Sequence, residues 1–230
     1  MQIIWHGQSC FQIIVTRSKG EQSSIVIDPF DESIGLRPPN LSANILLITH
    51  DHNDHNNKAA IKGLSRSAGG IEEPFLITCP GEYEIKEIFI QGVSAFHDDL
   101  QGRERGKVTI YTIEAEGLKL CHLSDLGQKE LTPDQLQNLG DIDILMIPVG
   151  GVYTISSKEA PKIISQIDPR IVIPMHYQIP KLNPPAGGKL EGVEKFLKAM
   201  GQKSTEPQLK LLIKKKDLPE GGRKIVVLKP

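Results

Sequence analysis

The sequence predicts an α/β fold, and two features of the chain support this class. Its apolar runs are short and often β-branched, as in strands, and they alternate with segments whose pattern is typical of helices. The chain has 230 residues and is 39% hydrophobic, so it can bury a substantial core. The sequence contains no evident internal repeat or low-complexity segment.

The expected strands are the apolar runs. The first several follow one another without an intervening helix, which favours antiparallel pairing. The expected strand segments are 1–6, 10–16, 24–28, 44–49, 74–78, 86–93, 107–114, 118–123, 142–148, 170–174 and 223–229.

Helices are expected over 56–66, 133–139, 157–167 and 189–200. The run Thr132-Pro133-Asp134-Gln135 supplies an N-cap, a proline at the first helical position and a capping-box glutamine. Ser156 and Glu159 form a second capping-box pattern before the helix over 157–167. Segment 180–188 contains three prolines and two glycines, so we expect a loop there.

Composition argues against several classes of partner. The formal net charge is −1 at pH 7 and the isoelectric point is near 6.7, so there is no general attraction to nucleic acid or an anionic membrane. No signal-peptide pattern is present, and no apolar stretch approaches the roughly 20 residues of a membrane span. We therefore expect a cytoplasmic protein with a small-molecule substrate and no nucleic-acid or membrane partner. The oligomeric state, including a homo-oligomer, stays open.

The densest cluster of metal-ligand residue types directly follows the apolar run 45–48. It consists of His50, His52, Asp54 and His55. Neutral imidazole and carboxylate are donors that suit Zn²⁺ and its first-row neighbours. In an extended turn, His50 and His52 can point toward one metal while Asp54 and His55 continue toward a second. The pattern predicts a two-metal site, and its alternative is a solvated polar loop.

Three further residues of ligand type stand at the ends of expected strands. His97 ends the run 93–97, Asp125 follows 118–123, and His176 follows 171–175. Taken singly, these residues have ordinary explanations as a surface histidine, a turn-capping aspartate and a packed core imidazole. Taken in this order after the first cluster, they resemble the ligand pattern of the metallo-β-lactamase superfamily, and the similarity extends along almost the whole chain.

The resemblance implies a fold and a set of ligands. The implied fold is a four-layer αββα sandwich of two mixed β-sheets flanked by helices, with residues 1–230 as one hydrolase domain. The implied ligands are His50, His52 and His97 for the first metal, Asp54, His55 and His176 for the second, and Asp125 as the bridge between them.

The implied cofactors are two zinc ions, with manganese as an alternative and iron less favoured. Metal binding lowers the pKa of water from about 15.7 to roughly 7, so a hydroxide bound between the ions is available near neutral pH. Such a hydroxide can attack an ester, a lactone or a phosphodiester, and the resemblance gives Asp54 the catalytic role of orienting it. We therefore expect a metal-dependent hydrolase.

Two other classes of function stay open. Some proteins of this fold hold two irons and perform redox chemistry, but they resemble a pattern with glutamate at the position of His52, so His52 favours hydrolysis. The other alternative is a metal-binding scaffold without turnover, which the retention of every ligand type disfavours.

The substrate is less constrained. The runs Ile3-Ile4-Trp5-His6-Gly7-Gln8-Ser9-Cys10-Phe11 and Ile25-Val26-Ile27-Asp28-Pro29 are similar to the ascorbate-6-phosphate lactonase-like branch of small Zn-dependent hydrolases. That branch usually has histidine where this chain has Gln8. Candidate substrate contacts are Gln8, Tyr83 in loop 79–83 and Tyr153 in loop 148–154, with simple turn chemistry as the alternative. No cluster of arginine or lysine beside the ligands indicates a phosphate.

Two neighbours of Asp125 need separate interpretation. His122 is three positions before Asp125, so we expect it on the opposite strand face, in the core or at the surface. Cys121 is four positions before Asp125 and would share its face at the metal rim, but a small buried core residue is the favoured interpretation. With only Cys10, Cys79 and Cys121 in the chain, reduced thiols are expected.

Overall fold

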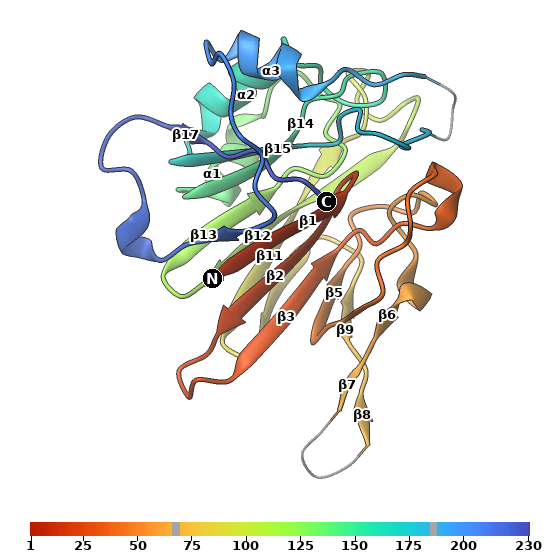
Figure 1. Ribbon diagram of the computed structural model, residues 1–230, viewed down its shortest axis with the longest axis vertical. Coiled ribbons are helices and arrows are strands. Elements are labelled where there is room, and N and C mark those ends of the chain that lie inside the picture. Colours follow the sequence, from red (N-terminus) through yellow and green to blue (C-terminus); the bar gives the residue numbers. More distant parts are fainter. Residues whose placement is uncertain (66–69, 185–187) are drawn as a thin grey trace.

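Two large β-sheets pack face to face and bury the main hydrophobic core between them (Figure 1). The computed structural model describes residues 1–65, 70–184 and 188–230. Residue 66 of the expected helix 56–66 and residues 185–187 of the expected loop 180–188 lie outside the described residues.

The first sheet has six strands in the order β16-β1-β2-β3-β5-β9. Strands β16, β1, β2 and β3 pair antiparallel, whereas β3, β5 and β9 pair parallel. The bounds are β1 Gln2–Gly7, β2 Cys10–Thr16, β3 Gln22–Ile27, β5 Ile45–Leu47, β9 Phe75–Ile77 and β16 Leu211–Leu212. The early strands therefore pair antiparallel, as the absence of intervening helices predicted.

The second sheet has seven strands in the order β10-β11-β12-β13-β14-β15-β17. It is antiparallel from β10 to β13 and parallel from β13 to β17. The bounds are β10 Gly81–Ile85, β11 Ile88–Phe96, β12 Lys107–Ala115, β13 Leu118–His122, β14 Ile144–Pro148, β15 Ile171–Met175 and β17 Lys224–Ile225. Both sheets are thus mixed, as the expected sandwich requires.

Three α-helices cover the outer side of the second sheet (Figure 1): α1 (Pro133–Leu139), α2 (Ala160–Ile167) and α3 (Val193–Ala199). Every residue of β14 and β15 is buried, as expected for parallel strands that are covered on both faces. Among the residues that the structure describes, no helix has the length and apolar character needed to cross a membrane.

Irregular segments cover the outer face of the first sheet. Along β3, Ile25 and Ile27 belong to the main core, whereas Val26 points the other way into a second apolar cluster. This cluster is Cys10, Val26, Phe30, Ile34, Ala43, Leu46, Ile48, Ile61, Leu182 and Leu190. The segments over it include the 3-10 turns Glu32–Ile34 and Lys58–Ala60.

Every expected strand segment contains a strand, and three of the four expected helices form. At α1, the Thr132 side chain accepts from the Gln135 N–H and the Gln135 side chain returns to Thr132, which completes the expected capping box. Helix α2 begins at Ala160, three residues later than expected. Of the two hydrogen bonds of the expected capping box, the structure has one: the Glu159 carboxylate accepts from the Ser156 N–H at 2.8 Å. Helix α3 is shorter than the expected 189–200.

The expectation of a helix over 56–66 is wrong. After the 3-10 turn Lys58–Ala60, the chain forms two short strands, β6 (Ile61–Lys62) and β7 (Leu64–Ser65). They pair with β4 (Leu41–Ser42) and β8 (Ile71–Glu72). Gly63 lies so close to β8 that a Cβ at this position would be 2.5 Å from the Glu72 carbonyl oxygen. These tertiary contacts override the local helical pattern.

Candidate metal centre

The ends of four strands bring the predicted ligands together. The cluster at 50–55 follows β5, His97 follows β11, Asp125 lies three residues after β13, and His176 follows β15. Close backbone packing joins these loops. A Cβ at Gly127 would lie 2.2 Å from the His97 carbonyl oxygen, and one at Gly150 would lie 2.1 Å from that of His176. Both positions therefore require glycine.

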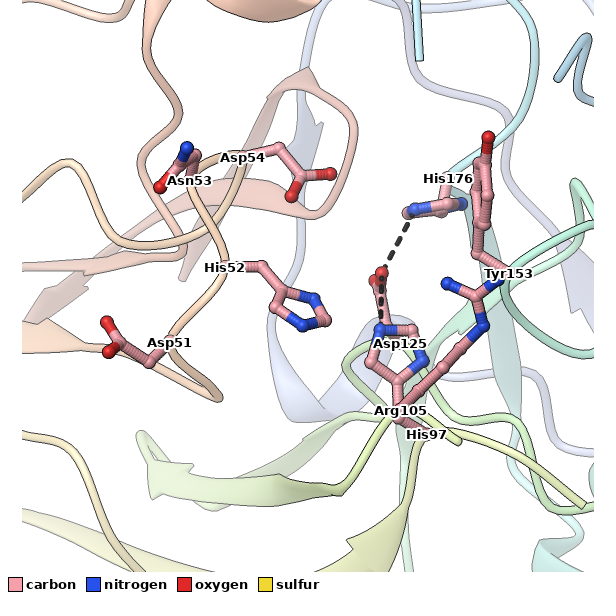
Figure 2. A pocket seen from close by; sticks show the side chains of 9 residues that line it. All are labelled: Asp51, His52, Asn53, Asp54, His97, Arg105, Asp125, Tyr153 and His176. Atoms are coloured by element: carbon pink, nitrogen blue, oxygen red, sulfur yellow. Dashed lines mark ion pairs between the residues drawn. The ribbon is translucent and has the colours of Figure 1, made fainter. Parts of the chain in front are cut away.

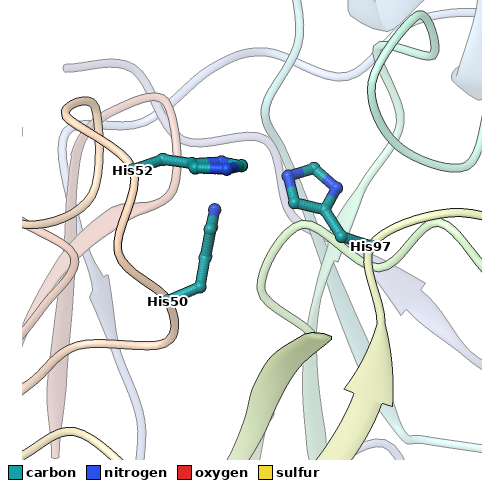
Figure 3. A group of neighbouring side chains, drawn as sticks. All are labelled: His50, His52 and His97. Carbon is teal, nitrogen blue, oxygen red and sulfur yellow. The ribbon is translucent and has the colours of Figure 1, made fainter. Parts of the chain in front are cut away.

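The first group of candidate ligands consists of His50, His52 and His97. Their ligand atoms lie within 4.8 Å of one another. Figure 3 shows the three rings converging, two from the loop after β5 and one from the end of β11. The rings of His50 and His52 meet edge to face, with centroids 4.5 Å apart. Three imidazoles in this arrangement can hold one metal ion.

The second group consists of Asp54, His55 and His176, and its ligand atoms also lie within 4.8 Å of one another. Asp125 stands between the two groups. Its Oδ2 is 3.2 Å from Nε2 of His55. The same oxygen is 3.2 Å from Nε2 of His176 and 3.6 Å from Nε2 of His97, and Figure 2 shows these two ion pairs. One carboxylate oxygen thus contacts residues of both groups, which is the position that a bridging ligand needs.

Asp28 and Thr49 set the orientation of two of the imidazoles. The buried Asp28 carboxylate accepts from the Thr49 N–H at 2.8 Å, from Thr49 Oγ1 at 2.7 Å and from His55 Nδ1 at 3.0 Å. Because Thr49 Oγ1 donates its proton to Asp28, it must accept from His50 Nδ1, 2.9 Å away. In their neutral forms, His50 and His55 therefore carry the proton on Nδ1 and direct an unprotonated Nε2 toward the site. A carboxylate behind a ligand histidine is the usual support of a metal site.

Two buried nitrogen atoms fit a metal ion directly. His50 Nε2 and His55 Nε2 are buried and have no partner in hydrogen-bond geometry within the described part of the chain. Buried polar atoms are normally paired, so unpaired ones call for an explanation. A metal ion at each group would supply the missing partner. The residues present therefore fit a two-metal centre.

Sequence reasoning gave Asp28 no role. Asp28 directly follows β3, just as His176 directly follows its own strand. Strand β3 is the parallel neighbour of β5, which leads into the ligand cluster. An aspartate that closes an apolar strand run beside the motif strand was the signal available in the sequence.

Burial keeps two of the histidines neutral. Burial, together with the nearby His55, lowers the pKa of His50 to about 2. Burial also lowers the pKa of His97. A histidine must be neutral to bind a metal ion, so both side chains are in the form that ligation requires.

The charges of the second group are coupled. Burial opposes charge on His55, but the carboxylates of Asp125 and Asp54 outweigh it and raise the pKa of His55. Burial likewise opposes charge on Asp125, but His176 and His55 outweigh it and lower the pKa of Asp125. The pKa of Asp54 is also lowered, against the effect of its burial, chiefly by His55. The metal-free group therefore holds a proton on His55 that a metal ion would displace.

Gln8 contacts the second group of ligands. Its Nε2 lies 2.9 Å from Asp54 Oδ2, to which it donates, and 2.8 Å from His176 Nε2, and the side chain is buried. The Gln8 carbonyl accepts from Trp5 Nε1 at 2.9 Å and from the His176 N–H at 3.0 Å, which fixes the turn. Gln8 is not among the described residues that line the pocket, so its role in substrate binding stays a prediction.

His122 is a buried core residue, as one of its two expected interpretations had it, but the strand-face argument for that position does not apply. Strand β13 ends at His122, so strand alternation does not extend to Asp125. His122 is buried, its Nε2 donates to the Ser9 carbonyl at 2.9 Å, and its Nδ1 accepts from the Ser124 N–H at 3.1 Å. Ser9 Oγ in turn donates to Asp125 Oδ1 at 3.0 Å. His122 therefore supports the turn that holds Asp125.

Cys121 is a buried core residue, as the favoured interpretation predicted. Its burial raises the pKa of its thiol. A buried, protonated thiol is a poor metal ligand and a poor nucleophile.

A pocket of about 290 Å³ opens onto the candidate metal centre (Figure 2). Its lining residues are Asp51, His52, Asn53, Asp54, His97, Arg105, Asp125, Tyr153 and His176. Of the two tyrosines considered from the sequence, Tyr153 lines this pocket. Tyr83 lies on β10, where its hydroxyl donates to the Cys79 carbonyl at 3.2 Å, and it is not among the described lining residues. Arg105 lines the pocket although no sequence motif indicated it.

The two mixed sheets and the histidine and aspartate side chains at their strand ends define a class, the metal-dependent hydrolases of the metallo-β-lactamase fold. Residues 2–176 match the family model for the beta-lactamase superfamily domain. A UPF0173 metal-dependent hydrolase of Thermococcus onnurineus is 30% identical, and the match covers 74% of this chain and 82% of that protein.

Solved structures agree with this class. One from Thermotoga maritima, described as a Zn-dependent hydrolase of the metallo-β-lactamase superfamily, is 34% identical with a TM-score of 0.73 and covers 99% of this chain and 98% of its own. The metallo hydrolase Igni18 from Ignicoccus hospitalis shares the fold at 18% identity, with a TM-score of 0.60 over 93% of this chain and 99% of its own.

The chain therefore belongs to the metallo-β-lactamase superfamily and is a metal-dependent hydrolase. The predicted superfamily and the predicted sandwich fold are both confirmed. The resemblance to the ascorbate-6-phosphate lactonase-like branch stays a prediction.

Proposed function

We propose that the chain uses two divalent metal ions, zinc or alternatively manganese, to hydrolyse an ester, lactone or phosphodiester bond of a small molecule. The observation that carries this proposal is the arrangement of two groups of three ligand-type residues with Asp125 in contact with both. This arrangement lies at the base of a pocket large enough for a small molecule but not for a folded partner.

In this proposal each residue group has a defined role. The first ion would be held by His50, His52 and His97, the second by Asp54, His55 and His176, and Asp125 would bind both. When bound, the two ions lower the pKa of a water molecule and stabilise the negative charge that develops at the attacked acyl or phosphoryl centre.

Asp54 has two properties that suit a catalytic role. It belongs to the second ligand group and also lines the pocket, so its carboxylate reaches the space that the substrate enters. Its lowered pKa keeps it ionised at neutral pH, and Gln8 Nε2 holds one of its oxygens by a hydrogen bond of 2.9 Å. We propose that the ionised carboxylate orients the attacking water by accepting a hydrogen bond from it.

Purified protein should be stripped of metal with a chelator, then reloaded separately with Zn²⁺ and Mn²⁺, and assayed on a panel of aryl esters, lactones and aryl phosphodiesters. We expect about two ions per chain by elemental analysis. Hydrolysis should be present in at least one metal-loaded form and absent from the stripped form. Full loading without hydrolysis of any of the three classes would contradict the proposed substrates, and a metal content near zero would contradict the ligand assignment.

A di-iron redox function is the weaker alternative. The di-iron proteins of this fold resemble a pattern with glutamate at the position of His52, whereas here the His52 ring lies beside those of His50 and His97. The absorption spectrum of the iron-loaded protein, compared with the zinc-loaded form, would test this alternative.

A further inference from the structure

One positively charged side chain lies at the pocket with no assigned role. Arg105 lines the pocket, and its guanidinium carbon lies 4.9 Å from the centroid of the Tyr153 ring. Figure 2 shows Arg105 and Tyr153 on the side of the pocket where His176 lies, opposite His52. In residues 1–65, 70–184 and 188–230 no carboxylate forms an ion pair with Arg105. Its charge is therefore available to a ligand.

The loop that carries Arg105 is built around one buried carboxylate. Asp98 Oδ1 accepts from the N–H groups of Leu100 and Gly102, at 2.9 and 2.8 Å. Asp98 Oδ2 accepts from those of Glu104 and Arg105, at 3.1 and 2.8 Å. Four charge-assisted hydrogen bonds to one side chain order the whole loop. The position of the Arg105 backbone is thus a property of the fold.

Tyr153 supplies a fixed surface beneath the guanidinium. Its hydroxyl accepts from the Gly188 N–H at 3.2 Å, and its backbone N–H donates to the Gly151 carbonyl at 2.7 Å. Its ring packs against the second apolar cluster. A guanidinium that stacks on a held aromatic ring keeps its donor edges free and loses less side-chain entropy when it binds a partner.

The charges around the pocket favour an anion. Two divalent ions would outweigh the carboxylates of Asp54 and Asp125, and Arg105 adds a further positive charge. The exposed Asp51 carboxylate, which accepts from Asn56, is the opposing charge at the rim among the described lining residues. Arginine presents paired N–H groups that match carboxylate and phosphate oxygens.

We infer that Arg105, held over Tyr153, binds an anionic group, a carboxylate or a phosphate, that the substrate carries apart from the bond that is hydrolysed. This inference rests on the proposed function, because it names the class of substrate for the same pocket. It assigns a specificity role to Arg105 and leaves the reaction at the metal ions unchanged.

Two matched esters test the inference by activity. Para-nitrophenyl butyrate and mono-para-nitrophenyl glutarate have the same leaving group, and the second carries a carboxylate on the terminal carbon of the butyryl chain. We expect Arg105→Gln to lower the ratio of kcat/KM for the charged ester to that for the neutral ester by about tenfold, mainly through KM. Arg105→Lys, which keeps the charge but loses the paired donors, should fall between.

Arg103→Gln is the matched control. Arg103 lies in the same loop but is not among the described residues that line the pocket. Its substitution should change the ratio by less than about twofold, as expected for a surface position. An unchanged ratio in Arg105→Gln would exclude a carboxylate as the bound group, and together with an unchanged Kd for phosphate it would overturn the inference. An equal fall in Arg103→Gln would also overturn it.

A binding measurement decides the inference independently of turnover. The zinc-loaded wild-type protein and its Arg105→Gln variant should be titrated calorimetrically with inorganic phosphate and with glutarate. We expect the variant to bind at least one of the two anions about tenfold more weakly, and the more affected anion identifies the group. Equal Kd values for both anions would show that the metal ions alone bind them, which would overturn the inference. Failure of the proposed hydrolysis would appear separately, as loaded protein that turns over nothing in the ester, lactone and phosphodiester panel.

Discussion

The two groups of candidate ligands differ in depth and in what supports them. The first group contains one exposed member, His52, beside the buried His50 and His97, whereas all three members of the second group are buried, with His55 and His176 at 0% and 1% exposed. The second group also receives direct contacts from Asp28 and Gln8. A buried, supported group is pre-organised for its ion, so we expect the second metal to bind more tightly than the first and to exchange more slowly.

The largest effect is expected from the residue that the two groups share. Asp125→Ala removes a carboxylate in contact with both groups, so it should reduce bound metal and lower hydrolysis by more than about 100-fold, since loss of a supporting partner alone costs 10–100-fold. Elemental analysis and steady-state kinetics measure both. Asp141→Ala, at an exposed position, is the control. Retention of two ions and full activity in Asp125→Ala would contradict the bridging assignment.

His52→Ala and His55→Ala compare the two groups directly. Because His52 is the exposed member of the first group, its loss should leave about one ion per chain, in the second group. Loss of the buried His55, which contacts both Asp54 and Asp125, should remove more metal. Metal content after dialysis is the measurement. Equal losses in the two variants would show that the groups do not differ in strength.

Asp28→Asn tests whether support from outside the ligand set makes the second group stronger. The amide keeps the shape of the carboxylate but loses the charge that holds His55 Nδ1, so metal affinity should fall by about 10–100-fold. Competition with a chromogenic chelator measures the affinity. Asp141→Asn, which makes the same chemical change at an exposed position, should leave it unaltered.

Metal affinity should depend on pH with a definite sign. The raised pKa of His55 means that the metal-free protein carries a proton on this ligand below that pKa, and the metal must displace it. Affinity should therefore rise with pH, by about tenfold per unit where one proton is released. Calorimetry in buffers of different ionisation enthalpy counts the released protons. An affinity that falls as pH rises would contradict the assignment of His55.

The smallest effect is expected at Gln8. Its Nε2 contacts both Asp54 and His176, so Gln8→His should alter kcat by less than about tenfold while metal content stays at its wild-type value. If Gln8 also contacts substrate, KM should change as well. Steady-state kinetics on the best substrate of the panel separates the two constants, and unchanged values of both would exclude a role in turnover.

The sequence by itself determined the strands and the chemical types at the site. Hydrophobic periodicity is a local property of the chain, and for this reason the apolar runs located β1, β2 and β12 almost to the residue. The metal-binding role of the cluster at 50–55 was also predicted from the sequence, because imidazole and carboxylate groups at that spacing have few functions other than metal binding. The strands β4, β6, β7, β8, β10 and β16 were not predicted, residues 81–83 of β10 having been expected as part of a loop. The helix over 56–66 was predicted wrongly. Pairing with other segments decides the conformation of these stretches.

Only the tertiary structure decided which side chains support the ligands and which face the pocket. Asp28 lies 27 residues from His55, and Ser9 lies 116 residues from Asp125, so neither pairing leaves a local pattern in the sequence. Arg105 reaches the pocket through a loop ordered around Asp98, and His122 acts through the turn at Ser9. Hydrogen-bond partners and cavity walls are determined by how distant segments pack in the folded chain, so they cannot be predicted from the spacing of residues in the sequence.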